Sequence, residues 1–179
     1  MVVGGGLDKM KSRPTGLRTA VYAGSFDPFT NGHYEMIRRG LVLFDNVIVL
    51  VGTNIRKQTM FTPEERVKLI EENFGDDFWV ETFDGLLANY MKENHYRFLL
   101  RGLRALSDFE YEFQMSLANR QLYFHMESVF LMANEADLYV SSSMVKEVAL
   151  MGGDASKWVP PPVWEALKNK VQNYKEVVK

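Results

Sequence analysis

Residues 19–33 read TAVYAGSFDPFTNGH and contain the first strand, turn and helix start that the sequence predicts. The first five residues are β-prone and end at Gly24. Residues 24–33 contain a proline and two glycines, the second of them in an Asn-Gly pair, and they predict a shaped turn that a ligand can approach closely. His33 then falls in the first turn of a predicted helix, whose free N–H groups and partial positive charge suit phosphate. The stretch predicts a strand–turn–helix unit with an anion site. A capped turn with a solvent-facing His33 is the alternative.

Further strands and helices alternate along the rest of the chain. The run NVIVLV is apolar throughout, which is typical of a strand buried on both faces. With the first strand, the predicted strands are residues 19–23, 46–51, 78–83, 98–100 and 129–132. The predicted helices are residues 33–44, 86–94, 107–123 and 141–150, one that opens at Thr62 and one that follows Pro162. This alternation predicts an α/β fold with a single doubly wound, parallel, five-stranded sheet and helices on both faces.

Local sequence signals mark several helix ends. Thr62 and Glu65 have the spacing of a capping box, with Pro63 at the first helical position. Ser107 and Glu110 have the same spacing and predict that a long helix opens at Ser107. Gly152 and Gly153 predict the end of the helix that opens near Ser141.

Composition restricts the function further. The chain has 179 residues and a formal net charge of -2, so neither a nucleic acid nor an anionic membrane is an expected partner. It contains no cysteine, which excludes disulfides and a cysteine nucleophile. We expect one domain over residues 19–179, preceded by a flexible leader or expression-derived segment at residues 1–18.

Anion-binding side chains follow four predicted strands. Besides the turn before His33, these are Arg56-Lys57, the two arginines Arg101 and Arg104, and the serine run at residues 141–143. Ligands of doubly wound sheets bind at the carboxyl ends of the strands, so these groups are predicted to converge there. Each group also has an explanation without a ligand. Arg56 and Lys57 can belong to a solvated basic loop, the arginines can form ion pairs with Asp108 or Glu110, and one serine can cap a helix. Neither a P-loop sequence nor a GxGxxG fingerprint is present.

Several stretches resemble one family of enzymes. The sequence TNGH at residues 30–33 resembles the T/HxGH signature of the nucleotidyltransferase superfamily, and SSSMVK at residues 141–146 resembles its second signature. The more specific matches are MFTPEERV (60–67), LLRGLRALSDFEYEFQM (99–115), ESVFLM (127–132) and VSSSMVKEVA (140–149). With these, the chain resembles the bacterial phosphopantetheine adenylyltransferases from about residue 19 to residue 170.

The resemblance implies a Rossmann-like nucleotidyltransferase fold and a specific reaction. ATP and 4′-phosphopantetheine would give dephospho-coenzyme A and pyrophosphate, in the penultimate step of coenzyme A synthesis. It also implies Mg²⁺, a cytoplasmic location and a homohexamer. Dephospho-coenzyme A and coenzyme A are then expected as product or feedback ligands.

Residue roles follow from the same resemblance. His33 matches a catalytic transition-state stabiliser, and Lys57 matches a catalytic residue that binds the acceptor phosphate. The other positions matching acceptor contacts are Ser25, Leu87 and Arg101. The positions matching ATP contacts are Ser25, Phe26, His33, Gly102, Leu103, Arg104, Glu112, Asp137, Leu138, Tyr139, Val140, Ser141, Ser142 and Ser143. Asp137 and Leu138 depart from the aromatic residue and serine that the family often has there.

The reaction needs no protein nucleophile, because a phosphate acceptor is already an anion. Positioning and charge stabilisation must then supply the catalysis. Magnesium is expected on phosphate oxygens and water, with no dedicated protein cage. Two other functions stay open on the sequence: a nucleotidyltransferase that uses nicotinamide mononucleotide or CTP, and a nucleotide-binding sensor or electron-transfer domain.

Overall fold

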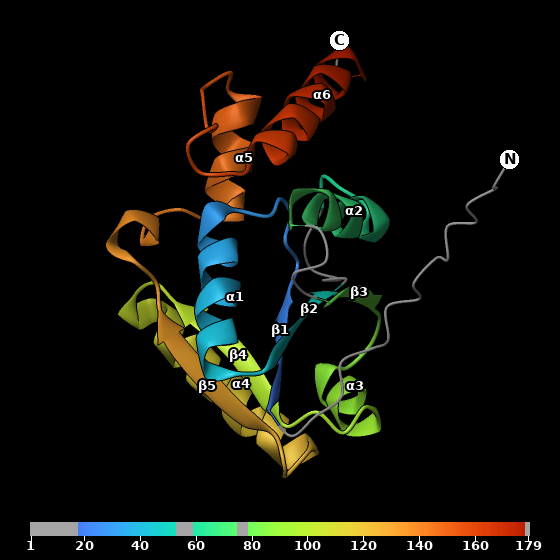
Figure 1. Ribbon diagram of the computed structural model, residues 1–179. Helices are drawn as coiled ribbons and strands as arrows, with labels where there is room; N and C mark the ends of the chain where they lie inside the picture. Colours follow the sequence, from blue (N-terminus) through green and yellow to red (C-terminus); the bar gives the residue numbers. More distant parts are fainter. Residues whose placement is uncertain (1–17, 53–58, 75–78, 178–179) are drawn as a thin grey trace, which may run out of the picture.

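The computed structural model describes residues 18–52, 59–74 and 79–177. It contains one sheet of five parallel strands in the order β3-β2-β1-β4-β5 (Figure 1). The strands are β1 (Thr19–Gly24), β2 (Asn46–Gly52), β3 (Trp79–Phe83), β4 (Phe98–Leu103) and β5 (Glu127–Met132). The predicted five-stranded parallel sheet is confirmed.

Helices cover both faces of this sheet. They are α1 (Asn31–Leu43), α2 (Pro63–Phe74), α3 (Leu87–Glu93), α4 (Leu106–Leu122), α5 (Ser142–Leu150) and α6 (Pro161–Val177), with a short 3₁₀ turn at Glu135–Asp137. Helices α1 and α2 pack on one face, and α3 and α4 on the other. Helices α5 and α6 lie beyond the end of the sheet at which α1 begins (Figure 1).

Alternation along the strands produces two apolar layers. On β1 and β2, Tyr22 and Val49 face the layer under α1 and α2, while Val21 and Ile48 face the layer under α3. All four side chains are buried. Successive side chains of a strand point to opposite faces, so a continuous apolar run is what a sheet covered on both sides requires.

Two helix-end predictions are confirmed. Thr62 N–H donates to Glu65 Oε2 at 2.8 Å, and Glu65 N–H donates to Thr62 Oγ1 at 3.2 Å, so the capping box is formed. After α5, Gly152 adopts a φ of 82°, a left-handed conformation that suits glycine at the end of a helix.

Two boundary predictions near the site are wrong. β4 continues to Leu103, because Arg101, Gly102 and Leu103 pair in register with residues 130–132 of β5; Arg101 therefore lies on a strand and not in a loop. α4 begins at Leu106 with Ala105 as its N-cap, so Ser107 lies inside the helix and does not cap it.

The strand order creates the crevice that holds the site. β1 and β4 are neighbours, yet β1 leads into α1 on one face and β4 leads into α4 on the other. The chain therefore leaves the sheet in opposite directions at adjacent strand ends. Ligands of doubly wound sheets bind at such a switch point.

Candidate active site

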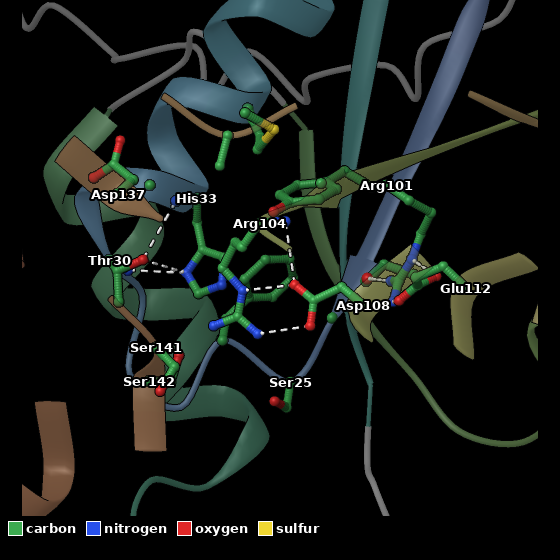
Figure 2. A pocket seen from close by; sticks show the side chains of 18 of the residues that line it. Ser25, Thr30, His33, Arg101, Arg104, Asp108, Glu112, Asp137, Ser141 and Ser142 are labelled. Carbon is green, nitrogen blue, oxygen red and sulfur yellow. Dashed lines mark hydrogen bonds and ion pairs between the residues drawn. The ribbon is translucent and has the colours of Figure 1, made fainter. Parts of the chain in front are cut away.

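A cavity of about 1020 Å³ opens at the carboxyl ends of β1 and β4 (Figure 2). Its walls come from the turn between β1 and α1, the end of β4, one face of α4, and the segment that leads into α5. The structure therefore brings together groups from three of the four predicted strand ends. The remaining strand end is that of β2. Arg56 and Lys57, which follow it in the sequence, lie outside the described residues.

His33 both caps α1 and faces the cavity. The backbone N–H of Thr30 donates to His33 Nδ1 at 3.0 Å, and His33 N–H donates to Thr30 Oγ1 at 3.3 Å. Because Nδ1 accepts a hydrogen bond, the ring proton of the neutral imidazole lies on Nε2. The helix cap thus fixes the tautomer that can donate to a ligand.

The surroundings of His33 keep its ring neutral. Burial lowers its pKa from 6.5 to about 3, and the charges of Arg104 and Arg101 act in the same direction. The rings of Phe26 and Phe29 lie with their centroids 5.1 and 5.4 Å from the imidazole. His33 is therefore a neutral hydrogen-bond donor at physiological pH.

Arg101 is held by an internal ion pair. Its Nε donates to Glu112 Oε2 at 2.7 Å, a second nitrogen donates to the other carboxylate oxygen, and a third bond of 2.6 Å reaches the carbonyl of Ala23. Although burial lowers the pKa of Arg101, the hydrogen bond and charge of Glu112 raise it above its ordinary value. Figure 2 shows the two side chains facing each other at one side of the cavity.

Arg104 is paired in the same way with Asp108. Its Nε donates to Asp108 Oδ2 at 3.0 Å, its backbone N–H reaches the same oxygen at 3.1 Å, and NH1 reaches the carbonyl of Val140 at 3.3 Å. Burial raises the pKa of Asp108, but the bonds from Arg104 outweigh it and leave that pKa below its usual value. The ion pair with Asp108, which the sequence analysis gave as an alternative, is therefore observed. Arg104 nevertheless lines the cavity.

The serine run lines the cavity at the start of α5. Ser141 is the N-cap, and its hydroxyl accepts from Met144 N–H at 3.1 Å. Ser142 donates to the carbonyl of Pro28 at 2.8 Å. All three serines line the cavity. One hydroxyl thus caps, one binds the β1–α1 turn, and the helix N-terminus faces the cavity.

The remaining predicted site residues divide into two groups. Those that line the cavity are Ser25, Phe26, Gly102, Asp137 and Val140. Leu87, Leu103, Leu138 and Tyr139 are not among the described residues that line it. Leu87 packs instead against the apolar layer under α3, and Leu103 is buried in β4.

Burial, followed by the charge of Glu35, raises the pKa of Asp137.

Several lining residues were missed by the sequence reasoning. They are Tyr22, Ala23, Thr30, Met36, Gly52, Phe83, Asp108, Tyr111, Met115 and Ala133. Thr30 could have been found, because it is the first residue of the TNGH stretch that resembles the T/HxGH signature. Met36 and Met115 carry no such signal, since a methionine on a helix is ordinarily a core residue.

Comparisons with known proteins define first the class and then the family. Residues 21–148 match the family model described as cytidylyltransferase-like, so the chain belongs to that family of nucleotidyltransferases. A phosphopantetheine adenylyltransferase of Thermotoga neapolitana is 50% identical over 158 residues, covering 87% of this chain and 98% of the relative. One from Anaeromyxobacter dehalogenans is 50% identical over 156 residues, covering 86% and 95%. The chain therefore belongs to the phosphopantetheine adenylyltransferase family and is an enzyme.

Solved structures support the fold alone. A bifunctional NMN adenylyltransferase/ADP ribose pyrophosphatase of Francisella tularensis superposes with a TM-score of 0.62 at 15% identity, over 90% of this chain and 56% of that one. A structure described as a nicotinate-nucleotide adenylyltransferase of Vibrio parahaemolyticus gives a TM-score of 0.61 at 17% identity, over 86% and 93%. The predicted Rossmann-like nucleotidyltransferase fold is thereby confirmed.

Proposed function

We propose that the protein transfers the adenylyl group of ATP to 4′-phosphopantetheine, giving dephospho-coenzyme A and pyrophosphate. The observation that carries the proposal is the convergence of His33, Arg104 and the N-terminus of α5 on one cavity. These groups donate hydrogen bonds to anions, and transfer to an acceptor that already bears a negative charge needs positioning and charge stabilisation but no protein nucleophile.

The reaction is a single displacement at phosphorus. An oxygen of the acceptor phosphate forms a bond to the α-phosphorus of ATP, and the bond from that phosphorus to the bridging oxygen of pyrophosphate breaks. His33 Nε2–H stabilises the charge that grows on the α-phosphate oxygens. The serines at the start of α5 and the helix N–H groups stabilise the departing pyrophosphate. No side chain has to accept a proton.

Binding of the two substrates is assigned to different groups of residues. Arg104, with the Gly102 backbone and the segment from Asp137 to Ser143, is proposed to hold ATP. Arg101 and Lys57 are proposed to hold the acceptor phosphate. Arg101 and Glu112 bind each other in the described structure, so acceptor binding at Arg101 would share or displace that carboxylate.

Magnesium is proposed to arrive with the phosphates. The part of the chain that the structure describes contains no group of three or more His, Asp or Glu side chains placed to hold a metal. The phosphate oxygens and water would then complete its octahedral coordination. Bound in this way, the ion would neutralise charge on the pyrophosphate that leaves.

A homohexamer is the proposed assembly. α4 carries apolar side chains on several sides, and many of them are exposed in the single chain: Leu106, Phe109, Tyr111, Phe113, Met115, Leu117 and Leu122. Exposed apolar surface of this extent marks an interaction site. Light scattering at micromolar concentration that finds only the 20.6 kDa monomer would contradict the hexamer.

We also propose that the enzyme is cytoplasmic. Its product, dephospho-coenzyme A, and the end product of the pathway, coenzyme A, are proposed to bind in the same cavity. None of the helices in the described ranges is both long and apolar enough to cross a bilayer. Competition of coenzyme A with ATP in steady-state kinetics tests the second part of this proposal.

Release of pyrophosphate tests the reaction. Release should require ATP, Mg²⁺ and 4′-phosphopantetheine together. The panel should include nicotinamide mononucleotide as the acceptor and CTP as the donor. Equal turnover with nicotinamide mononucleotide would overturn the acceptor assignment, and ATP binding without turnover would support a binding protein instead.

A further inference from the structure

The turn between β1 and α1 has a backbone that needs external support. Phe26 adopts a φ of 49°, in the left-handed region that a bulky side chain rarely occupies. Such a conformation persists only where the surroundings fix it, and it is typical of functional sites. The same turn carries Ser25 and Phe26 on the cavity wall and leads directly into Thr30 and His33.

Asp27 is the most heavily bonded residue of this turn. Only 3% of its surface is exposed. Its Oδ1 accepts from Phe61 N–H at 2.9 Å, and Oδ2 accepts from Met60 N–H at 3.0 Å. The ammonium of Lys146 donates to Oδ2 at 2.5 Å. One carboxylate thus joins the turn to the segment that precedes α2 and to α5.

Lys146 gives α5 a second attachment to the turn. Ser142, one helical turn earlier on the same face, already donates to the carbonyl of Pro28. Two adjacent residues of the turn are therefore bound by two side chains that α5 presents four positions apart. Lys146 is 20% exposed and lies outside the set of described residues that line the cavity. It is placed to act on the site only through other residues.

A third attachment comes from α2. Arg66, buried in the core, donates to the carbonyl of Ser25 at 2.5 Å and to the carbonyl of Gly52 at 3.2 Å. Together with the bonds at Asp27 and Pro28, it fixes the turn at three positions by contacts from α2, from the segment before α2 and from α5. The turn therefore moves only if α2 or α5 moves with it.

We propose that the buried pair Asp27–Lys146 is a positioning device for adenylyl transfer. It locks the β1–α1 turn to α5, and so it fixes the separation between two sets of donors: His33 at the start of α1, and the serines with the N–H groups at the start of α5. The inference rests on the proposed function, in which one set stabilises the α-phosphate and the other the pyrophosphate. Because the two sets act on adjacent phosphorus atoms, a displacement of about 1 Å between them lowers turnover by up to roughly 100-fold.

Steady-state kinetics of three variants tests the proposal. Lys146→Met removes the charge and keeps most of the side chain's length, and Lys146→Arg restores the charge. Lys170→Met is the control, because Lys170 pairs with Glu65 at a similar distance, 2.7 Å, and this more exposed pair ties α6 to α2 without involving a residue of the turn. Each variant is assayed well below its own midpoint of thermal unfolding.

We expect Lys146→Met to lower kcat roughly 10- to 100-fold, with a smaller change in the KM for ATP, and Lys146→Arg to recover most of the loss. Lys170→Met should lower the melting temperature while kcat stays within about twofold of the wild type. Wild-type kcat in folded Lys146→Met would overturn the proposal, and so would an equal loss in Lys170→Met. An inactive wild-type enzyme would instead contradict the proposed function.

A double-mutant cycle provides a measurement that does not depend on one variant. Asp27→Asn keeps an oxygen for the N–H groups of Met60 and Phe61 but removes the charge that Lys146 faces. If the two residues act as one device, Asp27→Asn combined with Lys146→Met should lose no more kcat than the worse single variant. Losses that multiply would show two independent effects and overturn the proposal.

Discussion

The hydrogen-bond donors on the two sides of the cavity differ in charge and in whether they are already paired. On the side of the helix N-termini, the donors are neutral and already fixed: Thr30 holds the ring of His33, and Ser141 caps α5. On the side of β4 and α4, the donors are charged but already paired: Arg101 is bound by Glu112, and Arg104 by Asp108. A ligand can use the first side as it stands, whereas it has to compete with carboxylates for the second.

This difference assigns different tasks to the two sides. A preorganised neutral donor needs no rearrangement as charge develops, so its effect belongs to the transition state. An arginine that is shared with a carboxylate gains less from each new phosphate contact, so its effect belongs to binding and to selectivity. Kinetic constants separate the two, because kcat reports the first and KM the second.

The largest expected effect is on turnover, at the neutral side. His33→Ala should lower kcat roughly 100-fold or more, with a much smaller change in the KM for ATP. The reason is that Nε2–H donates a hydrogen bond to negative charge that develops on the α-phosphate only in the transition state. Steady-state kinetics, with circular dichroism to confirm folding, measures this. A kcat near that of the wild type would mean that His33 serves only as a helix cap.

The next effect is on ATP binding, at the charged side. Arg104→Ala should raise the KM for ATP about 10-fold or more, since a hydrogen bond to a charged group is lost. Asp108→Asn should lower that KM roughly 2- to 5-fold, because it frees Arg104 from a partly exposed ion pair. Opposite signs are the essential result. Glu127→Gln is the control: it breaks the Arg120–Glu127 pair at the far end of β5 and should leave the KM unchanged.

A smaller effect separates the cap from the chemistry. Thr30→Ala removes the hydroxyl that accepts from His33 N–H, and should lower the free energy of unfolding by about 1 kcal/mol. The backbone N–H of Thr30 still binds His33 Nδ1, so kcat should fall far less than in His33→Ala. Urea unfolding and kinetics on the same preparation measure both. Equal losses of kcat in the two variants would remove the distinction between them.

The smallest expected change concerns the His33 ring, which should not titrate between pH 8 and pH 5. With a pKa of about 3, His33 should stay neutral with its proton on Nε2 from pH 8 to pH 5. Nitrogen NMR of the ring, assigned by the signal lost in His33→Ala, checks this directly. A midpoint near 6.5 would contradict it.

The same pKa has a consequence for stability. Because the folded-state pKa of a basic group is lowered, the unfolded chain takes up the proton first as the pH falls. The contribution of His33 to stability is therefore complete above its ordinary pKa of 6.5 and declines as the pH falls from there towards 3.

The order of helices and strands can be predicted from the sequence, because the signals involved are local. Uninterrupted apolar runs identified strands buried on both faces, and the spacing of Thr62 and Glu65 identified a helix start that the structure confirms. The motifs around His33 and after Leu99 were long enough to indicate the family. The position of the site followed from these, since parallel strands place their carboxyl ends at one edge.

The contacts between charges that lie far apart in the sequence are known only from the folded structure. Arg101 and Glu112 are eleven positions apart, and Asp27 and Lys146 are 119 apart. No periodicity of the chain joins such residues, because their contact depends on how β4, α4 and α5 pack. The Ser107 prediction failed because α4 begins at Leu106 with Ala105 as its N-cap, and in its first turn it is Asp108 that accepts from the backbone N–H of Arg104. Local chemistry fixed the elements, whereas the pairing of buried charges was fixed by distances that exist only in the folded molecule.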